Sequence, residues 1–453
     1  MRHDFHPTSL REYDIRGIIG ETLGEADAYA IGRSFGTRIA RAGGSRVAVG
    51  YDGRTSSPGL EAKLVEGLNA SGVDAVRIGL GPTPMLYFAV HELGCNGGVM
   101  ITGSHNPPNY NGFKMMLGQG PFFGADIQAL GRMAAAGDWA DGAGTSTTHE
   151  IMDRYVERLL QGFDGRAFNI AWDCGNGVAG PVVERLVKLL PGTHQTLFTD
   201  VDGAFPNHHP DPTDEANLVD LKRVVAERGC DFGVAFDGDG DRIGVVDETG
   251  RIIWGDELMV LLSRNVLAEN PGATIIAEVK CSQTLFDDIE KNGGVPIMWK
   301  AGHSIIKSKM KETSAALAGE MSGHIFFADR FYGFDDATYA GARVLEILSK
   351  TDKPLSDLLS DIPKTFSTPE LRTDCPDETK FKVVEQIAEY FGRDHKVITI
   401  DGARILFENG WGLVRASNTQ AILVSRFEAD SDEHLKNIRE IVETQMEKAI
   451  AIN

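Results

Sequence analysis

The chain has few residues of the kinds that form disulfides, bind zinc or cross a membrane. Its five cysteines lie far apart and form no Cys-x-x-Cys pair, which argues against a disulfide or zinc framework and favours a reducing compartment. No run approaches the roughly 18 apolar residues that a membrane helix needs, and the N-terminal segment lacks the apolar core of a signal peptide. We therefore expect a cytoplasmic protein with no membrane partner.

Basic residues are also scarce relative to acidic ones. The 45 Lys and Arg residues are outnumbered by 65 Asp and Glu residues, which gives a formal net charge of -20. A nucleic-acid-binding protein normally carries a basic balance or a basic stripe, so we expect no nucleic-acid partner. A large charge of one sign keeps a protein soluble and monomeric, and we expect a monomer. Any site for an anionic substrate must then be made by local cations.

Three segments of the chain share one pattern, an apolar run that ends in an aspartate near a glycine. They are VAVGYDGR (47–54), IAWDCGNG (170–177) and VAFDGDGD (234–241). A short apolar run bounded by turn residues predicts a buried strand, and amphipathic segments such as 57–72 and 180–192 predict helices. Alternating strands and helices form α/β units around a largely parallel sheet, where ligands bind at the carboxyl ends of strands. We therefore expect the chemistry at the Asp-Gly ends.

The length of 453 residues fits three or four domains at roughly 100–200 residues each. Residues 273–312 repeat the strand and helix theme in a third α/β unit. Residues 379–451 predict a hairpin and a further strand flanked by helices, which is a small α+β domain. We predict three α/β domains and one α+β domain, with these bounds: 1–147, 148–253, 254–366 and 367–453.

The segment from Gly97 to Leu117 contains the first chemical signal, a strand that delivers GSHNPP into a tight polar loop. The loop presents the hydroxyl of Ser104, which needs a base or a metal ion to become a nucleophile. Lys114 follows closely enough to return to the same pocket. His105 is a candidate base, but neighbours in a tight loop often point apart, and we interpret it as mainly structural. A polar turn in which the serine caps the backbone is the alternative.

The second signal is DGDGDR, in which Asp237, Asp239 and Asp241 are separated by single glycines. Three close carboxylates repel one another unless they share a cation, and hard oxygen ligands suit Mg²⁺ or Ca²⁺. An EF-hand is the main rival, and Glu248 falls at its twelfth position. However, Arg242 occupies the position where an EF-hand needs glycine, and the flanks predict strands rather than helices. A purely structural turn is the other alternative. Arg242 beside the carboxylates suits phosphoryl transfer, because its fork can clamp phosphate oxygens.

The third signal is GEMSGH, which carries a carboxylate, a hydroxyl and an imidazole. In an extended loop, Glu320 and Ser322 would face the same way and could bind adjacent sugar hydroxyls. His324 has a pKa near neutrality in water and is a candidate general acid or base. A capped turn with a core histidine is the alternative.

The fourth signal is RASNTQ, which offers a guanidinium, two hydroxyls and an amide within five residues. Arg415, Ser417, Asn418 and Thr419 together with nearby backbone N–H groups could cradle a phosphate, although a surface turn is the alternative. Four weaker candidates for substrate contacts complete the set: Tyr13, Arg16, Lys280 and His303.

Together these segments resemble the α-D-phosphohexomutase family, and within it the bacterial phosphomannomutase/phosphoglucomutase branch. In the related phosphoglucosamine mutase branch, the position of Met321 usually carries Gln. Gln420 and Ala421 depart from the commoner residues of the family, outside the expected contacts. The resemblance covers essentially the whole chain and is carried by motifs in family order: YDIRG (13–17), TGSHNP (102–107), DGDGDR (237–242), GHSIIKSKMKE (302–312), GEMSGH (319–324) and RASNT (415–419).

The resemblance implies four domains around a central cleft and a mutase activity. A phosphoryl group on Ser104 would pass to a hexose 1-phosphate, and the 1,6-bisphosphate would turn over and return its other phosphoryl group to Ser104. Mannose and glucose phosphates are the expected substrates, with Mg²⁺ as cofactor and glucose 1,6-bisphosphate or mannose 1,6-bisphosphate as activator. Three alternatives stay open: a phosphoglucosamine mutase, a metal-dependent sugar phosphatase, and a non-enzymatic sugar-phosphate sensor, against which the four intact motifs argue.

The implied roles follow the four loops. The catalytic group would be Ser104, Lys114, Arg242 and His324, with acid and base not assigned between Lys114 and His324. The Mg²⁺ ligands would be Ser104, Asp237, Asp239 and Asp241. The remaining residues would contact the substrate: Tyr13, Arg16, Lys280, His303, Glu320, Met321, Ser322, Gly323, His324, Arg415, Ser417, Asn418 and Thr419.

Overall fold

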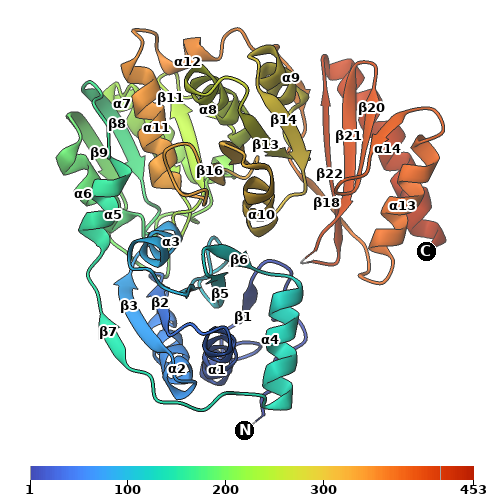
Figure 1. Ribbon diagram of the computed structural model, residues 1–453. Helices are drawn as coiled ribbons and strands as arrows, with labels where there is room; N and C mark the ends of the chain where they lie inside the picture. The colour runs from blue at the N-terminus through green and yellow to red at the C-terminus, as the bar shows by residue number, and fades with distance from the viewer. Residues whose placement is uncertain (1, 419) are drawn as a thin grey trace.

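The computed structural model describes residues 2–418 and 420–453, and their strands form four sheets. Figure 1 shows the units built on these sheets side by side in an arc, with the fourth unit (red) beside the third. The first three sheets each combine parallel strands with antiparallel strands, whereas the pairs of the fourth sheet are antiparallel. The prediction of three α/β units followed by an α+β unit is therefore confirmed. The division at 147, 253 and 366 stays a prediction.

The first sheet has the strand order β1-β5-β4-β2-β3-β7, with β6 paired to β5. Helices α1, α2 and α4 pack on one face, and α3 packs on the other. The strands are β1 (Ile15–Ile18), β2 (Arg46–Tyr51), β3 (Asp74–Leu80), β4 (Gly97–Ile101), β5 (Tyr110–Leu117), β6 (Gly120–Phe122) and β7 (Ser146–Thr148). The helices are α1 (Glu25–Arg41), α2 (Ser57–Ala70), α3 (Thr83–Glu92) and α4 (Ala125–Ala136).

The second sheet has the order β12-β11-β10-β8-β9, and the third has the order β14-β13-β15-β16. The strands of the second are β8 (Phe168–Asp173), β9 (Gly192–Leu197), β10 (Phe232–Phe236), β11 (Ile243–Asp247) and β12 (Ile252–Ile253). Its helices are α5 (Met152–Leu159), α6 (Gly180–Leu189), the short 3₁₀ helix η1 (Glu215–Leu218) and α7 (Val219–Arg228). The strands of the third are β13 (Thr274–Glu278), β14 (Val295–Trp299), β15 (Leu317–Gly319) and β16 (Ile325–Phe327). Its helices are α8 (Gly255–Glu269), α9 (Gln283–Lys291), α10 (His303–Thr313), α11 (Ala337–Ser349) and α12 (Leu355–Leu358).

The fourth sheet has the order β17-β22-β21-β20-β19, with β18 also paired to β22. Its strands are β17 (Phe366–Ser367), β18 (Leu371–Asp374), β19 (Lys396–Ile398), β20 (Ala403–Phe407), β21 (Gly410–Ala416) and β22 (Ile422–Ala429). Helices α13 (Lys380–Phe391) and α14 (Asp432–Ile452) cover it and form a core of their own. Ser431 begins α14 by accepting the backbone N–H of His434, as an N-cap serine does.

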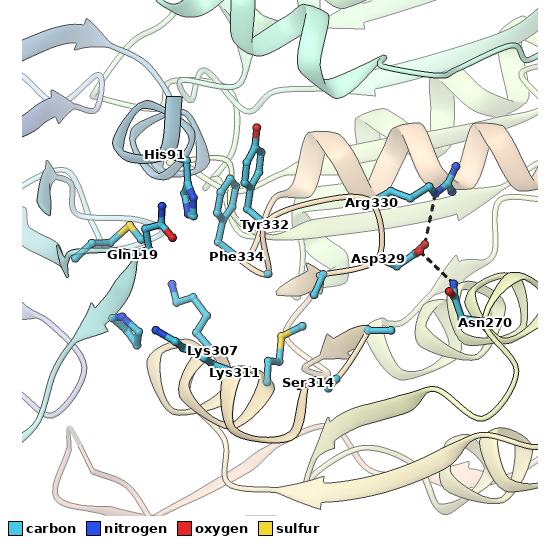
Figure 2. A pocket seen from close by; sticks show the side chains of 17 residues that line it. His91, Gln119, Asn270, Lys307, Lys311, Ser314, Asp329, Arg330, Tyr332 and Phe334 are labelled. Carbon is cyan, nitrogen blue, oxygen red and sulfur yellow. Dashed lines mark hydrogen bonds and ion pairs between the residues drawn. The ribbon is translucent and has the colours of Figure 1, made fainter. Parts of the chain in front are cut away.

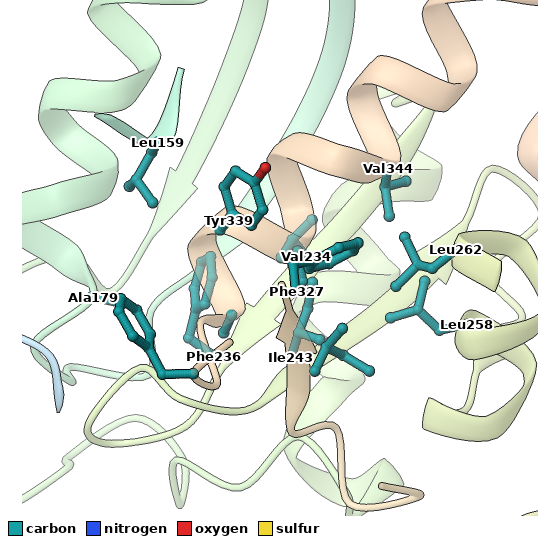
Figure 3. Packing of buried hydrophobic residues seen from close by; sticks show 14 of the residues in the cluster. Leu159, Ala179, Val234, Phe236, Ile243, Leu258, Leu262, Phe327, Tyr339 and Val344 are labelled. Atoms are coloured by element: carbon teal, nitrogen blue, oxygen red, sulfur yellow. The ribbon is translucent and has the colours of Figure 1, made fainter. Parts of the chain in front are cut away.

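One continuous hydrophobic core joins the first three units, and this fixes the loops between them. Helix α11 belongs to the third unit in sequence but packs on β10 and β11 of the second. Figure 3 shows Tyr339 of α11 on the side of Val234 and Phe236 of that sheet, and Val344 beside Leu258 and Leu262 of α8. Burying such side chains is worth about 1.5–3 kcal/mol each, so the units hold one another firmly.

The three Asp-Gly runs form β2, β8 and β10, and each ends where a loop carries polar residues. The aspartate loop lies between the antiparallel strands β10 and β11, so the EF-hand hypothesis is wrong, because that motif needs two helices. Within residues 2–418 and 420–453, no helix combines the length and the apolar character that a membrane span requires.

Candidate active site

The serine loop leaves the carboxyl end of β4 and brings Ser104 into a buried position. Ser104 is 2% exposed and has a φ of +50°, a left-handed conformation that costs energy outside glycine and is typical of functional sites. Its hydroxyl donates to Oδ2 of Asp237 over 3.0 Å and lies 3.2 Å from Nδ1 of His105. The neighbouring histidine ring therefore points toward the hydroxyl, contrary to our expectation that it points away.

Arg54 holds this loop in place, and the sequence analysis did not identify it. Its buried guanidinium donates to the backbone oxygens of Ser104 and Asn106 over 2.8 and 2.6 Å, and to those of Pro107 and Tyr110. A Cβ atom on the loop's first glycine would lie 2.3 Å from the guanidinium carbon, so the backbone must pass directly against Arg54. The signal for Arg54 was present, because it ends the first Asp-Gly run, VAVGYDGR.

The aspartate loop places three carboxylates within reach of one cation. One ligand oxygen from each of Asp237, Asp239 and Asp241 lies within 4.8 Å of the others, and all three side chains are fully buried. Among the described residues, Oδ1 of Asp239 and Oδ1 of Asp241 have no hydrogen-bond partner. Unpaired carboxylate oxygens are costly in a buried site, and a bound Mg²⁺ would satisfy them. The residues present therefore fit a divalent metal ion.

Lys114 supplies the positive charge of this cluster. Its ammonium donates to Oδ2 of Asp239 over 2.7 Å and also to Asp241. Burial lowers the pKa of Lys114, but the carboxylates of Asp239 and Asp241 outweigh burial and raise that pKa above its ordinary value. Burial likewise raises the pKa of Asp239, and the ammonium outweighs it and holds that pKa below its ordinary value. Thr83 and Thr102 donate to the same Oδ2, and Thr83 is a further contact that the sequence analysis missed.

The sugar loop closes onto the aspartate loop through His324 and Arg242. The two residues form a backbone bridge, and Nε of Arg242 donates to Nε2 of His324 over 2.9 Å. Gly323 has a φ of +88°, and a Cβ atom there would lie 2.4 Å from the carbonyl oxygen of Ile243, so only glycine fits this approach. The His303 ring stacks on His324 with centroids 5.6 Å apart. These predicted residues are therefore brought together beside Ser104 and the carboxylates.

The segment from Glu320 to Gly323 is a tight turn rather than the extended loop that we expected, because the N–H of Gly323 donates to the carbonyl of Glu320 over 3.0 Å. The buried carboxylate of Glu320 accepts the N–H of Gly302, and the N–H of Met321 donates to Glu278 over 3.3 Å. Ser322 is half-buried at the corner of the turn. The glycine in the sequence signalled the turn, and the antiparallel pairing of β15 with β16 imposes it.

The C-terminal loop meets the rest of the molecule through Tyr13. The amide of Asn418 donates to the Tyr13 hydroxyl over 2.7 Å, and this hydroxyl donates to the carbonyl of Ala301 over 3.0 Å. Asp401 pairs with Arg415 over 3.0 Å and also accepts the N–H of Ala301. Three units therefore converge at this hydroxyl. Ser417 is buried after β21, and its hydroxyl accepts the N–H of the residue at 420, whereas Thr419 lies outside the described residues.

Lys280 and Arg16 lie at the ends of other buried contacts. The ammonium of Lys280 pairs with Glu370 over 3.0 Å and with Glu278 over 3.8 Å, so it joins the third unit to the fourth. Arg16 pairs with Asp14, and among the described residues its buried Nε has no hydrogen-bond partner. The structure thus separates the expected site into a carboxylate cluster around Ser104 and a set of interdomain contacts around Tyr13.

Comparisons with known proteins give a consistent result over the whole chain. Four family models match in order: phosphoglucomutase/phosphomannomutase α/β/α domain I at 7–139, domain II at 153–250, domain III at 254–366 and the C-terminal domain at 370–445. A phosphomannomutase/phosphoglucomutase of Pseudomonas putida is 47% identical over 443 residues, which cover 97% of this chain and 96% of the relative.

Two further relatives have different descriptions. A phosphoglucomutase of Neisseria gonorrhoeae is 47% identical over 438 residues, which cover 95% of each chain. A crystal structure of a phosphoglucomutase/phosphomannomutase family protein from Burkholderia thailandensis is 44% identical, covers 98% of each chain and superposes with a TM-score of 0.93. Two relatives that are each 47% identical to this chain are therefore named differently, one for both mannose and glucose phosphates and the other for glucose phosphate alone.

Proposed function

This chain belongs to the phosphoglucomutase/phosphomannomutase family of α-D-phosphohexomutases, and on that basis we propose that it moves a phosphoryl group between O1 and O6 of a hexose phosphate. The observation that carries the proposal is the position of the Ser104 hydroxyl, 3.0 Å from Asp237 in a cluster of three buried carboxylates. A nucleophile beside a metal site is the arrangement that phosphoryl transfer needs.

In the proposed cycle, Ser104 carries the phosphoryl group at rest. The bond from phosphorus to Oγ of Ser104 breaks as a substrate hydroxyl oxygen bonds to phosphorus, and the hydroxyl proton passes to a base. Lys114 keeps its charge between two carboxylates, so we assign proton acceptance to Nε2 of His324, whose lone pair accepts the N–H of Arg242 at rest and becomes available when Arg242 turns to the transferring group. Arg242 lies beside this nitrogen and would clamp the oxygens of the transferring group. In the second half of the cycle, the other phosphoryl group returns to Oγ.

Mg²⁺ held by Asp237, Asp239 and Asp241 with an oxygen on Ser104 would neutralise the negative charge that develops during transfer. Arg54 would keep the serine loop rigid against this cluster, since it holds four backbone oxygens of the loop. Such rigidity supports catalysis, because transfer depends mainly on position and charge.

At the far end of the substrate, Glu320 and Ser322 would bind O3 and O4, which glucose and mannose share. Met321, Gly323, His303, Lys280, Arg16 and Tyr13 would line the same space, and Arg415, Ser417, Asn418 and Thr419 would hold the distal phosphate. We further propose glucose 1,6-bisphosphate or mannose 1,6-bisphosphate as activator, which would restore the phosphoryl group of Ser104. A monomeric, cytoplasmic enzyme without nucleic-acid or membrane partners stays our prediction.

Phosphorus NMR tests the proposal directly. The purified protein with Mg²⁺ and a trace of glucose 1,6-bisphosphate is given mannose 1-phosphate, glucose 1-phosphate and glucosamine 1-phosphate in parallel. We expect the first two to become 6-phosphates with little free phosphate. We expect a chelator to stop turnover, and Ser104→Ala to lower kcat by about 10⁴- to 10⁶-fold while the fold survives, because the group that carries the phosphoryl is gone.

The other outcomes distinguish the alternatives. Fast conversion of the glucosamine ester alone would make the chain a phosphoglucosamine mutase and overturn our assignment of Met321. Release of free phosphate alone would make it a sugar phosphatase. Near-normal turnover of Ser104→Ala would remove Ser104 from the reaction.

A further inference from the structure

Besides Asp241, a second carboxylate lies at Nδ1 of His324, whereas Arg242 contacts the other ring nitrogen, Nε2. Asp335 lies on the loop between β16 and α11 and is fully buried. Its Oδ2 is 3.0 Å from Nδ1 of His324, and its Oδ1 accepts the ammonium of Lys307 over 2.9 Å. A backbone bridge to Phe326 fixes the position of Asp335 next to the strand that follows His324. None of the predicted motifs includes this aspartate.

The contacts of His324 determine which ring nitrogen carries the proton. Nε of Arg242 can only donate, and it lies 2.9 Å from Nε2 of His324, so Nε2 must offer a lone pair. In the neutral ring the proton then lies on Nδ1, which faces Asp335. Asp241, His324 and Asp335 could also hold a metal ion, since their ligand atoms lie within 4.8 Å. That ion would need a second lone pair on the same ring, which only the imidazolate has. Nδ1 lies 3.0 Å from Oδ2 of Asp335 and 3.6 Å from Oδ1 of Asp241, so the carboxylate of Asp335 is the nearer partner for the proton on Nδ1.

We propose that Asp335 is a positioning residue, which together with Arg242 holds His324 in the tautomer that keeps the lone pair on Nε2, with Lys307 as the counter-charge of Asp335. This inference depends on the proposed mutase activity and on His324 as its proton acceptor. Lys307 contacts the other carboxylate oxygen of Asp335, Oδ1. Its side chain also lines a pocket of about 590 Å³ together with Phe334 and His91 (Figure 2). The ion pair with Lys307 keeps Asp335 an acceptor, and an acceptor behind Nδ1 fixes both the ring orientation and the tautomer.

The electrostatics of Asp335 agree with this geometry. Burial raises the pKa of Asp335, but the charge of Lys307 and the contact with His324 outweigh it and hold that pKa well below its ordinary value. The ammonium of Lys307 also contacts the Tyr87 hydroxyl and lies 4.3 Å from the centre of the Tyr87 ring, which fixes it in place. The ion pair with Lys307 and the 3.0 Å contact with His324 both favour the ionised form of Asp335.

The next residue along the chain provides a matched control. Asp336 is also buried, but its carboxylate begins α11 by accepting the N–H of Tyr339 over 2.9 Å and accepts the Tyr155 hydroxyl over 2.7 Å. No contact joins its side chain to His324 among the described residues. Asp336→Asn and Asp335→Asn thus make the same substitution at neighbouring buried positions. Asp336 has structural contacts, and burial raises its pKa to about 7, whereas Asp335 faces the His324 ring.

The first test separates the two positions by kinetics. For Asp335→Asn we expect kcat to fall by about 10²- to 10⁴-fold with KM within about threefold, because an amide can donate to Nδ1 and favour the wrong tautomer. For Asp336→Asn we expect kcat within about threefold of the parent, since its lost contacts concern stability. The double variant with His324→Asn should be no slower than His324→Asn alone, because Asp335 acts through that ring. Additive losses, or equal losses in both Asp variants, would overturn the proposal.

The second test does not depend on activity. Long-range ¹H–¹⁵N spectra of the ¹⁵N-histidine-labelled protein report the tautomer of each ring, and His324→Asn assigns the signal. We expect Nδ1 of His324 to carry the proton in the parent and in Asp336→Asn. In Asp335→Asn we expect a measurable fraction of the rings to carry it on Nε2, because Arg242 alone then favours the original tautomer. An unchanged tautomer in Asp335→Asn would contradict the proposal even if turnover fell. Absence of mutase turnover in the parent would instead remove the proposed function, and the spectra would still decide the role of Asp335.

Discussion

The two ends of the candidate site are built in opposite ways. At the serine end, the contacts of Asp237, Asp239, Asp241 and Lys114 join side chains that are almost entirely buried and come from two different units. At the phosphate end, a hydrogen bond from the exposed Asn418 to Tyr13 joins the loop after β21 to the first unit. The first end is fixed by ion pairs between buried side chains of two units, whereas the second meets the first unit through a neutral hydrogen bond at the surface.

This difference fits the proposed reaction. The transferring group needs fixed charges around it, whereas a bisphosphate that turns over must be released by the loop that holds its other end. Arg415 is an example of a contact suited to release. Its guanidinium already forms an ion pair with Asp401, so a substrate phosphate would have to compete with that carboxylate. We infer that the serine end works by being rigid and the phosphate end by opening.

The largest expected effect comes from removing the charge that holds the serine end together. Lys114→Met leaves three buried carboxylates without their cation, and we expect the free energy of unfolding to fall by about 3–5 kcal/mol in the presence of a chelator. Mg²⁺ should restore part of this loss, because an ion that binds only the folded state adds stability. Urea unfolding with chelator and with Mg²⁺ measures both quantities.

Lys350 provides the matched control for this change. Its ammonium pairs with Glu269 and Glu346 over 2.8 and 2.9 Å, but its side chain is 50% exposed. Lys350→Met should change stability by no more than about 1 kcal/mol, with or without Mg²⁺. If Lys114→Met in chelator were as stable as Lys350→Met, the buried cluster would not need its cation and the contrast between the two ends would fail.

A smaller effect is expected where the phosphate end meets the first unit. Tyr13→Phe removes the hydroxyl that joins Asn418 to Ala301, and we expect KM for the hexose phosphate to rise about 3- to 10-fold, from hydrogen bonds worth about 0.5–1.5 kcal/mol each. We expect kcat to change by less than about threefold, because the serine end is untouched. Tyr155→Phe is the control, since its hydroxyl binds Asp336 and should affect stability without raising KM. A fall in kcat alone would place Tyr13 in the chemical step.

The two ends also differ in how far the sequence could predict them. The serine and aspartate loops were found because each is a short run in which glycines separate the polar residues, so that the chemistry is local in the chain. Arg54, Thr83 and Asp335 were not assigned, because only folding brings them to the serine and aspartate loops. Arg54 ends the first Asp-Gly run and Asp335 adjoins Asp336, but neither pattern shows which loop the side chain reaches. The strand order also decided between a metal loop of this kind and an EF-hand, which spacing alone had left open. The contacts of Tyr13 depend on how the units meet, which no local pattern indicates.

A third contact at the phosphate end is charged, and its strength should therefore depend on pH. The charge of Lys280 lowers the pKa of Glu370 to about 2, from an ordinary value of 4.5. A carboxyl group whose pKa is lowered by folding stabilises the protein above its unfolded pKa and loses this contribution as pH falls through the folded pKa. The contribution should be complete above about pH 5 and lost progressively between about pH 4.5 and 2. Because the side chain of Glu370 is 25% exposed, solvent reduces the effect to about 1 kcal/mol at pH 3.

Glu370→Gln removes this titration and gives the smallest of the expected effects. The parent should lose about 1 kcal/mol more stability than Glu370→Gln between pH 6 and pH 3, as measured by urea unfolding at both pH values. Glu443→Gln is the control, because Glu443 pairs with Arg439 on the surface of α14 and should leave the pH dependence of the parent within about 0.5 kcal/mol. If Glu370→Gln and the parent lost equal stability on acidification, the Lys280 pair would contribute nothing to holding the fourth unit. The fourth unit would then be held on the third by the buried pair of Arg426 with Asp256 and by the apolar packing of Trp411 and Leu413 on Val279.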